Sequence, residues 1–232
     1  ELGRTYDMIC NNPREGYRHW ILGKKIKNKA GEVTGKLNKY IINWLTTNLN
    51  SLIMDRSCIF DDNEKKDGII YYGTFRKHRA DHFVHHLTKG VTCSSSKKHW
   101  KKFQALECDC DYREKVSWEK TKEDLRKYKY SLYIEDEHTH ENFAFLANRY
   151  YEALMCNVVV LFDHHCSQTI EKSGYIIPEE FVIPEHSNIA KYSKTLNYEK
   201  MLEIQKQNIE IAFRDKAECI SEIEDFTYFA LH

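Results

Sequence analysis

The chain has 232 residues, of which 41% are hydrophobic, so it is long enough and apolar enough to bury a core. Lys plus Arg and Asp plus Glu both number 35, and the resulting zero net charge excludes a global attraction to nucleic acid or anionic membranes. The longest apolar run, Val158–Phe162, is far shorter than the ~20 residues of a membrane span. Basic stretches at residues 24–29 and 97–102 have the charge to bind phosphates, although a solvated helix face is the simpler interpretation.

The eight cysteines are irregularly spaced, which is not the pattern of a small disulfide-stapled domain. No Asn-x-Ser/Thr sequon occurs, which weighs against a secreted protein. We therefore expect a reducing, cytoplasmic setting. The chain does not begin with Met, and we expect it to be part of a longer protein.

A polar, turn-rich block at Asp61–Gly68 is the best candidate for a boundary between two parts of the chain. Before it, Tyr6–Cys10 has the character of a short strand. Lys36–Leu52 carries apolar residues at helical spacing. The sequence thus predicts a first part over residues 1–60 and a larger second part over residues 61–232.

After this boundary, short apolar runs alternate with helical patterns. The predicted strands are Ile69–Tyr72, Val91–Ser94, Phe103–Glu107, Tyr130–Ile134 and Val158–Phe162, with an extended segment at Tyr175–Ile183. The predicted helices are Lys77–Leu87, Glu119–Lys127, Asn142–Leu154 and Glu199–Phe213. Such alternation predicts an α/β fold with a parallel sheet.

The stretch from Tyr128 to Asp163 is the most informative part of the sequence. It runs Tyr128–Asp136 (YKYSLYIED), then Asn148–Leu154 (NRYYEAL), then Asn157–Val160 (NVVV). This order resembles the donor-site region of GT-B glycosyltransferases, which are built from two Rossmann-like halves. The motif is most similar to that of fucosyltransferases, and phage DNA glucosyltransferases have a similar Glu-containing helix before a buried strand.

The motif also departs from the fucosyltransferase pattern at several positions. Asn148 stands in place of Glu, Arg149 in place of Lys, and Val159 in place of Pro. Ala144 occupies the place of the earlier of two Glu residues in the broader GT-B pattern. These departures leave the superfamily resemblance clearer than any single family.

The resemblance implies that residues 61–232 form a Rossmann-like, nucleotide-sugar-binding domain, the donor half of a GT-B enzyme. Residues 1–60 would then be a partial acceptor-side segment. Ligands of open parallel sheets bind beyond the carboxyl ends of the strands, where Glu135 lies. Glu152 matches the family carboxylate that holds the ribose hydroxyls. Arg149, near the start of its helix, is the candidate for gripping the diphosphate. An exposed helical Glu and an ordinary surface ion pair are the alternatives.

A second candidate segment follows the strand Ile69–Tyr72. Gly73 ends this strand and permits close approach of backbone to a ligand. Arg76 and Arg79 follow at the start of the next helix. In GT-B donor domains such a loop carries Arg or Lys onto the diphosphate, and we expect the same of Arg76 and Arg79, although a strand-Gly-basic pattern is common.

Histidine and cysteine clusters offer a metal site as an alternative. His82, His85 and His86 have helical spacing, and Cys108-x-Cys110 and His164-His165-Cys166 add further ligand types, but none matches the usual zinc spacing. His164 and His165 follow a predicted strand and could contact the donor sugar, although a surface loop is the simpler interpretation. We expect no metal ligands among the site residues and no tightly bound cofactor. The nucleotide sugar, with UDP or GDP, is a co-substrate.

The acceptor side offers few candidates for a general base. Glu15 and His19 are the titratable groups of Asn11–Trp20, and each has a plain surface residue as its alternative. The predicted function is sugar transfer from a nucleotide sugar to a glycan or a modified DNA base, in a phage or bacterial protein without a membrane span. The alternatives are a nucleic-acid-binding or processing protein and a non-catalytic α/β interaction module.

Overall fold

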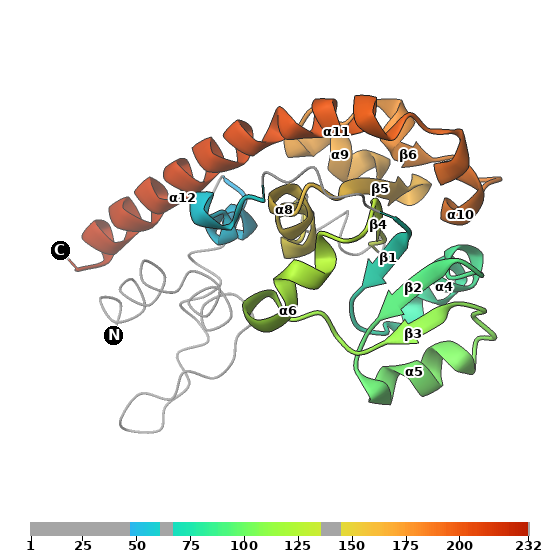
Figure 1. Cartoon of the computed structure of the whole chain (residues 1–232). Coiled ribbons are helices and arrows are strands. Elements are labelled where there is room, and N and C mark those ends of the chain that lie inside the picture. Colours follow the sequence, from blue (N-terminus) through green and yellow to red (C-terminus); the bar gives the residue numbers. More distant parts are fainter. Residues whose placement is uncertain (1–46, 61–66, 136–144, 232) are drawn as a thin grey trace, which may run out of the picture. The chain divides into compact units, whose positions relative to one another are not determined.

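The computed structural model of the chain describes residues 47–60, 67–135 and 145–231 (Figure 1). It divides into two compact units, residues 55–209 and a second unit made of residues 1–54 and 210–232. The expected strand Tyr6–Cys10, the candidate bases Glu15 and His19, and most of Lys36–Leu52 lie outside the described residues. Each unit is taken by itself below.

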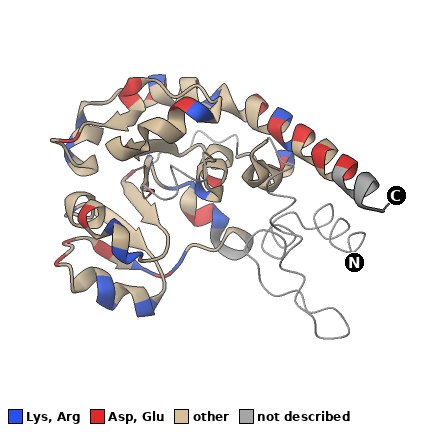
Figure 2. Ribbon diagram, turned by 180° about the vertical axis from the view of Figure 1, so that it is seen from behind, with Lys and Arg blue, Asp and Glu red and all other residues tan. Residues whose placement is uncertain are grey.

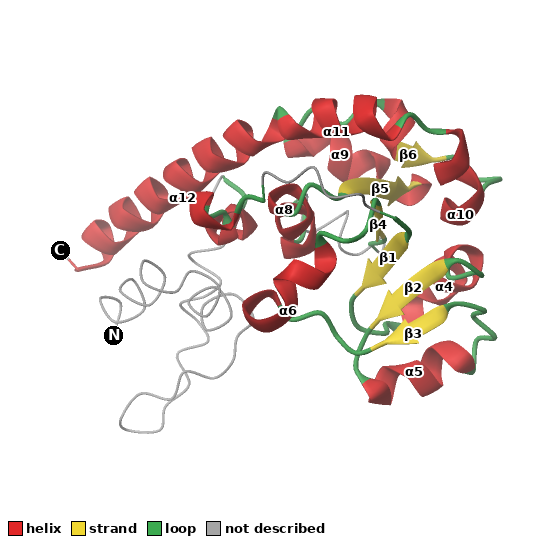
Figure 3. Cartoon of the chain, in the orientation of Figure 1, coloured by secondary structure: helices red, strands yellow, loops and turns green. Residues whose placement is uncertain are grey.

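Residues 55–209 contain a six-stranded sheet in the order β3-β2-β1-β4-β5-β6 (Figure 3). Every neighbouring pair is parallel. The strands are β1 (Ile69–Tyr72), β2 (Val91–Ser94), β3 (Asp111–Arg113), β4 (Tyr130–Tyr133), β5 (Val159–Asp163) and β6 (Val182–Ile183). This is the Rossmann strand order, and it confirms the predicted α/β class.

The three central strands are buried along their whole length. Every residue of β1, β4 and β5 is buried. Val159–Asp163 is nearly all apolar, as expected of a strand covered on both faces by helices. β4 pairs with β5 from Tyr130–Val159 to Tyr133–Phe162, so the ends of these two strands lie at one edge.

Helices connect successive strands and pack against this sheet (Figure 1). The α-helices are α4 (Ala80–His86), α5 (Lys97–Gln104), α6 (Trp118–Leu125), α8 (Asn148–Met155), α9 (Ser167–Ser173), α10 (Ile189–Tyr192) and α11 (Tyr198–Lys206). The 3₁₀ turns are η2 (Arg56–Cys58), η3 (Lys77–Arg79), η4 (His164–Cys166), η5 (Glu179–Phe181) and η6 (Ser193–Thr195). Together η3 and α4 fill the helix predicted over Lys77–Leu87.

The predicted strand over Phe103–Glu107 is wrong. Phe103 belongs to α5, which begins after Ser96, and the third strand follows later at Asp111–Arg113. Phe103 is fully buried, whereas Lys97, Lys98, Lys101 and Lys102 are exposed. A lysine-rich helix that buries one aromatic residue was therefore mistaken for a strand. Figure 2 shows Lys and Arg residues in blue along this helix, and their exposure matches the solvated-face interpretation.

Two predicted helices have different bounds in the structure. The helix expected from Asn142 begins at Asn148, and residues 142–144 are not described. The helix expected over Glu199–Phe213 is two helices, α11 and α12 (Asn208–Leu231), which are separated at Gln207. The Gln205 side chain at this junction accepts from Val160 N at 2.8 Å and donates to Val158 O at 2.8 Å, so it is held against β5.

In the second unit, α12 is hydrogen-bonded to residues on either side of η1 (Leu49–Ile53). Thr47 Oγ1 donates to Glu222 Oε2 at 2.7 Å, and Lys216 Nζ donates to Met54 O at 2.6 Å. The helix expected to run through to Leu52 does not, because Asn48 is extended and its side chain caps η1. The predicted roles of residues 1–60 and 61–232 stay predictions.

None of the helices in the described part of the chain is both long and apolar enough to cross a membrane.

Candidate functional site

The candidate site lies where the strand order of the sheet reverses. β1 is flanked by β2 on one side and by β4 on the other, so successive connections leave in opposite directions. Ligands of open α/β sheets bind at such a switch point, beyond the carboxyl ends of the strands. Gly73 directly follows β1 and Glu135 follows β4, so the sequence placed both residues at the correct edge.

The Glu135 carboxylate is held by two guanidinium groups from different elements. Arg79, at the end of η3, donates through Nη2 to Oε2 at 2.5 Å. Arg149, in the first turn of α8, donates to Oε1. The side chains of Glu135, Arg79 and Arg149 are only 5%, 12% and 15% exposed. Three segments that the sequence singled out separately are thus joined by one charge network.

Arg149 is fixed by further contacts. Its Nη2 also donates to Ile134 O at 2.5 Å, and its guanidinium lies 4.4 Å from the centroid of the Tyr133 ring. The Tyr72 hydroxyl donates to the Arg149 carbonyl at 2.5 Å, which ties β1 to α8. Burial disfavours the charged guanidinium, but the attraction of Glu135 outweighs it and raises the pKa of Arg149. Arg149 is therefore a permanent, pre-positioned cation.

Glu152 lies one turn further along α8. It is 7% exposed, so the interpretation as an exposed helical carboxylate is wrong. Arg149 is likewise not an ordinary surface pair. Asn148–Leu154 is one helical stretch as predicted, with Arg149 and Glu152 three residues apart.

Gly73 and Arg76 have more ordinary surroundings. A Cβ at Gly73 would lie 2.8 Å from the Tyr71 hydroxyl, so the glycine is required by close packing. Its carbonyl accepts from Ser95 Oγ at 2.6 Å. Arg76 precedes η3 and is exposed. Whether either residue contacts a donor stays a prediction.

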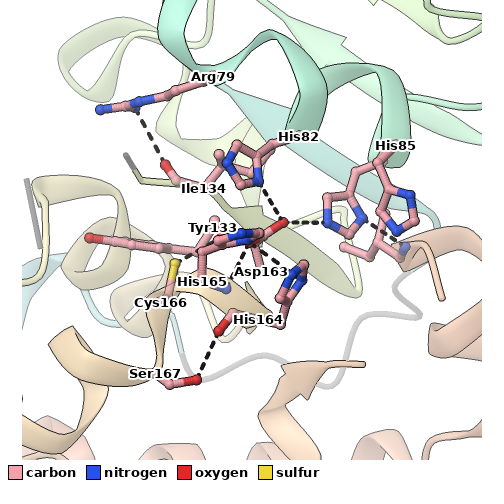
Figure 4. Close-up of polar contacts among 12 residues, drawn as sticks. Arg79, His82, His85, Tyr133, Ile134, Asp163, His164, His165, Cys166 and Ser167 are labelled. Carbon is pink, nitrogen blue, oxygen red and sulfur yellow. Dashed lines mark hydrogen bonds and ion pairs between the residues drawn. The ribbon is translucent and has the colours of Figure 1, made fainter. Parts of the chain in front are cut away.

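A second carboxylate, Asp163, gathers histidines at the end of the neighbouring strand β5 (Figure 4). Its Oδ2 lies 3.1 Å from His82 Nδ1 and 2.8 Å from His86 Nε2. Its Oδ1 lies 2.9 Å from His165 Nδ1 and accepts the His165 backbone N–H at 2.9 Å. Burial disfavours the charged carboxylate, but hydrogen bonds from His82 and His86 outweigh it and hold the pKa of Asp163 well below its usual range.

The sequence identified the histidines of this cluster but not Asp163, which brings them together. The available signal was an acidic residue that ends a buried apolar strand and precedes two histidines. His82, Asp163 and His165 offer ligand atoms that all lie within 4.8 Å of one another. Within the described ranges, this group is close enough together to hold a metal ion, and the expectation of no metal ligands stays a prediction.

The fold and the strand order define the class of this domain as Rossmann-like α/β. No protein-family model matches the chain, and no curated protein matches it in sequence. Several solved structures do match the chain in fold. The chain is similar to T4 phage beta-glucosyltransferase, with a TM-score of 0.63 and 18% identity over 76% of this chain and 56% of that one. The same enzyme with UDP and Mn²⁺ gives a TM-score of 0.61 at 18% identity, over 77% and 54% of the two chains.

A further structure, the DNA-modifying enzyme beta-glucosyltransferase in the presence and absence of uridine diphosphoglucose, gives a TM-score of 0.58 and 18% identity. The alignment covers 77% of this chain and 57% of that one. The chain thus spans little more than half the length of the solved enzymes that it matches. At this identity the likeness establishes the fold, which is that of the phage glucosyltransferases.

Proposed function

We propose that the chain is the donor-binding part of a glycosyltransferase that transfers a sugar from a nucleotide sugar. One observation carries this proposal, namely that Arg79 and Arg149 converge on Glu135 at the switch point of a Rossmann-like sheet. A nucleoside diphosphate bound there would meet fixed positive charge at its phosphates. The phosphates gain negative charge as the sugar leaves, and preorganised cations stabilise that charge best in the transition state.

The proposed division of labour follows from the two positions on α8. Arg149 would stabilise the departing diphosphate, helped by Arg79 and by the exposed Arg76. Glu152, one turn further on, would accept hydrogen bonds from the two ribose hydroxyls. These hydrogen bonds would be equally strong in the ground state and in the transition state. A general base from the acceptor side, for which Glu15 and His19 are the candidates, would deprotonate the acceptor hydroxyl if the reaction inverts the anomeric carbon.

The structural neighbours favour UDP-glucose as the donor and a modified DNA base as the acceptor. Their names pair T4 phage beta-glucosyltransferase with UDP, with UDP-glucose and with DNA modification. A glycan acceptor, a GDP sugar and the finer resemblance to fucosyltransferases are the other forms of the same proposal. A phage or bacterial cytoplasm is the expected setting.

Nucleotide binding provides the direct test. A ligand that binds only the folded state raises the melting temperature, by an amount equivalent to about 2.7 kcal/mol at 100 times its Kd. We expect UDP and UDP-glucose to raise the melting temperature of the wild-type chain, and Glu152→Gln to reduce that rise. Lys77→Ala, an exposed residue of η3, serves as the control. No rise with UDP, GDP or their sugars would contradict the proposal.

The basic face of α5 favours one rival function, nucleic-acid binding without sugar transfer. Four exposed lysines on one short helix would neutralise phosphates regardless of sequence. Binding to unmodified DNA that weakens steeply with salt, together with no response to any nucleotide, would support this rival.

A further inference from the structure

The histidine cluster around Asp163 has the composition and spacing of a metal site. Two imidazoles and one carboxylate, from His82, His165 and Asp163, are brought together from α4, η4 and the end of β5 (Figure 4). Two histidines with one carboxylate form a ligand set that zinc uses in catalytic sites, where water or substrate takes the fourth position. Imidazole ligands favour Zn²⁺ and similar transition metals over the hard cations Mg²⁺ and Ca²⁺.

The distances within the cluster suit such an ion. Zinc binds nitrogen and oxygen at about 2.0–2.2 Å, so neighbouring ligand atoms of a tetrahedral site lie roughly 3.3 Å apart. His82 Nδ1 and His165 Nδ1 lie 3.1 Å and 2.9 Å from the two Asp163 oxygens. A metal ion would replace the protons that now lie between these nitrogens and oxygens, and the three ligand atoms, which lie within 4.8 Å of one another, would draw together around it.

Groups that are not ligands hold the carboxylate in position. His86 is fully buried, and its Nδ1 accepts the backbone N–H of Ile189 at 3.2 Å. This fixes the tautomer, so His86 Nε2 carries the proton and donates to Asp163 Oδ2 at 2.8 Å. The backbone N–H of His165 donates to the other oxygen. Metal-binding carboxylates are commonly oriented by such outer hydrogen bonds.

The cluster is also open to solvent on one side. The side chain of Asp163 is 1% exposed, that of His82 17% and that of His165 55%. An ion can therefore enter from the His165 side, and a water molecule or a ligand oxygen can complete its coordination.

We propose that His82, Asp163 and His165 form a binding site for one divalent transition metal ion of the zinc class, with His86 as the residue that positions Asp163. This site is distinct from the Arg79–Glu135–Arg149 network and does not rest on the proposed donor binding. It replaces, for these residues, the sequence-based expectation that no metal is held. A hydrogen-bonded cluster without affinity for metal is the competing explanation.

Titration with Co²⁺ in the absence of nucleotide tests the proposal. We expect one Co²⁺ per chain, seen as visible d–d absorption, and displacement by Zn²⁺ but not by Mg²⁺, because Zn²⁺ binds such sites more tightly than Co²⁺. His165→Gln and His82→Gln each remove one ligand and should weaken binding by at least about tenfold. His85→Gln is the matched control on α4, since His85 Nε2 contacts Ser187 O at 2.9 Å, away from Asp163. We expect its affinity to stay within about twofold of wild type.

The result that overturns the proposal is equally specific. Co²⁺ binding that is absent, or that is equally strong in wild type and His165→Gln, would leave only a hydrogen-bonded cluster. Binding at cysteine thiolates instead would show an intense near-ultraviolet band that survives both substitutions, and it would also count against the site. His165 is more than half exposed, so His165→Gln should fold like the wild type, as far-UV circular dichroism can check.

Discussion

Two buried carboxylates stand side by side at the carboxyl edge of the sheet, and they have opposite kinds of partners. Glu135, after β4, is held between the guanidiniums of Arg79 and Arg149. Asp163, at the end of β5, is held by the imidazoles of His82, His86 and His165. Guanidinium is always charged, whereas imidazole can be neutral and can bind a metal ion.

The Glu135 network is therefore permanently charged, whereas the partners of Asp163 can change their protonation state. Glu135 balances two cations that cannot lose their charge, so its removal leaves uncompensated charge in a nearly buried place. Asp163 is balanced by groups that can give up a proton without losing their hydrogen-bonding shape. The first arrangement suits anion binding beside it, and the second suits metal binding.

The largest expected effect comes from breaking the Glu135 network. Glu135→Gln leaves Arg79 and Arg149 without their counter-charge and should lower the free energy of unfolding by about 3–5 kcal/mol. Asp163→Asn should cost less, about 1–3 kcal/mol, since the imidazoles can become neutral. Urea denaturation of both variants measures the contrast. Equal losses, or a larger loss for Asp163→Asn, would contradict the distinction drawn between the two carboxylates.

Arg149 tests the proposed role of the permanent network in catalysis. Arg149→Ala removes charge stabilisation that grows as the diphosphate leaves, and it should lower kcat by an amount equivalent to about 2–4 kcal/mol. Arg149→Lys keeps the charge but loses the fork geometry, so an intermediate loss is expected. Steady-state kinetics with UDP-glucose provides the measurement. An unchanged kcat in Arg149→Ala, with the variant correctly folded, would remove Arg149 from the mechanism.

The sequence anticipated the permanent network better than the histidine cluster. Short apolar runs predicted β1 and β2 to the residue, and the motif resemblance drew attention to Arg149 and Glu152. The pairing of Arg79 with Glu135 was not predicted, because it depends on which strands become neighbours. Local pattern cannot specify strand order, and the reversal between β1 and β4 is what brings these residues together.

Errors arose where tertiary context overrode local pattern. Phe103 was assigned to a strand, although Lys97–Gln104 packs as a helix on a single buried aromatic side chain. Asp163 was overlooked because a single acidic residue after an apolar run is common. Its partners His82 and His86 lie about 80 residues earlier in the chain, and only the fold brings them near.

Glu152 should show a smaller and different effect from Arg149. Glu152→Gln keeps the shape of the side chain but weakens two ribose hydrogen bonds that are equally strong in the ground and transition states. The KM for the nucleotide sugar should therefore rise by about tenfold, equivalent to about 1–1.5 kcal/mol, while kcat stays near wild type. A fall in kcat with unchanged KM would instead place Glu152 in the chemical step.

The smallest expected effect concerns Arg76, the exposed arginine that is a candidate for diphosphate binding together with Arg79. Arg79 is tied to Glu135, whereas Arg76 lies on the surface, where solvent and salt screen its charge. Arg76→Ala should leave the free energy of unfolding within about 0.5 kcal/mol of wild type. It should weaken UDP binding only about two- to fivefold, as befits an exposed ionic contact, and this loss should shrink as salt is raised. Isothermal titration with UDP at low and high ionic strength measures the affinity and its dependence on salt.

Lys77→Ala, which removes a neighbouring exposed charge, should leave UDP affinity unchanged. If the two variants weakened binding equally, long-range charge alone would account for the loss, and Arg76 would have no place in the diphosphate contact.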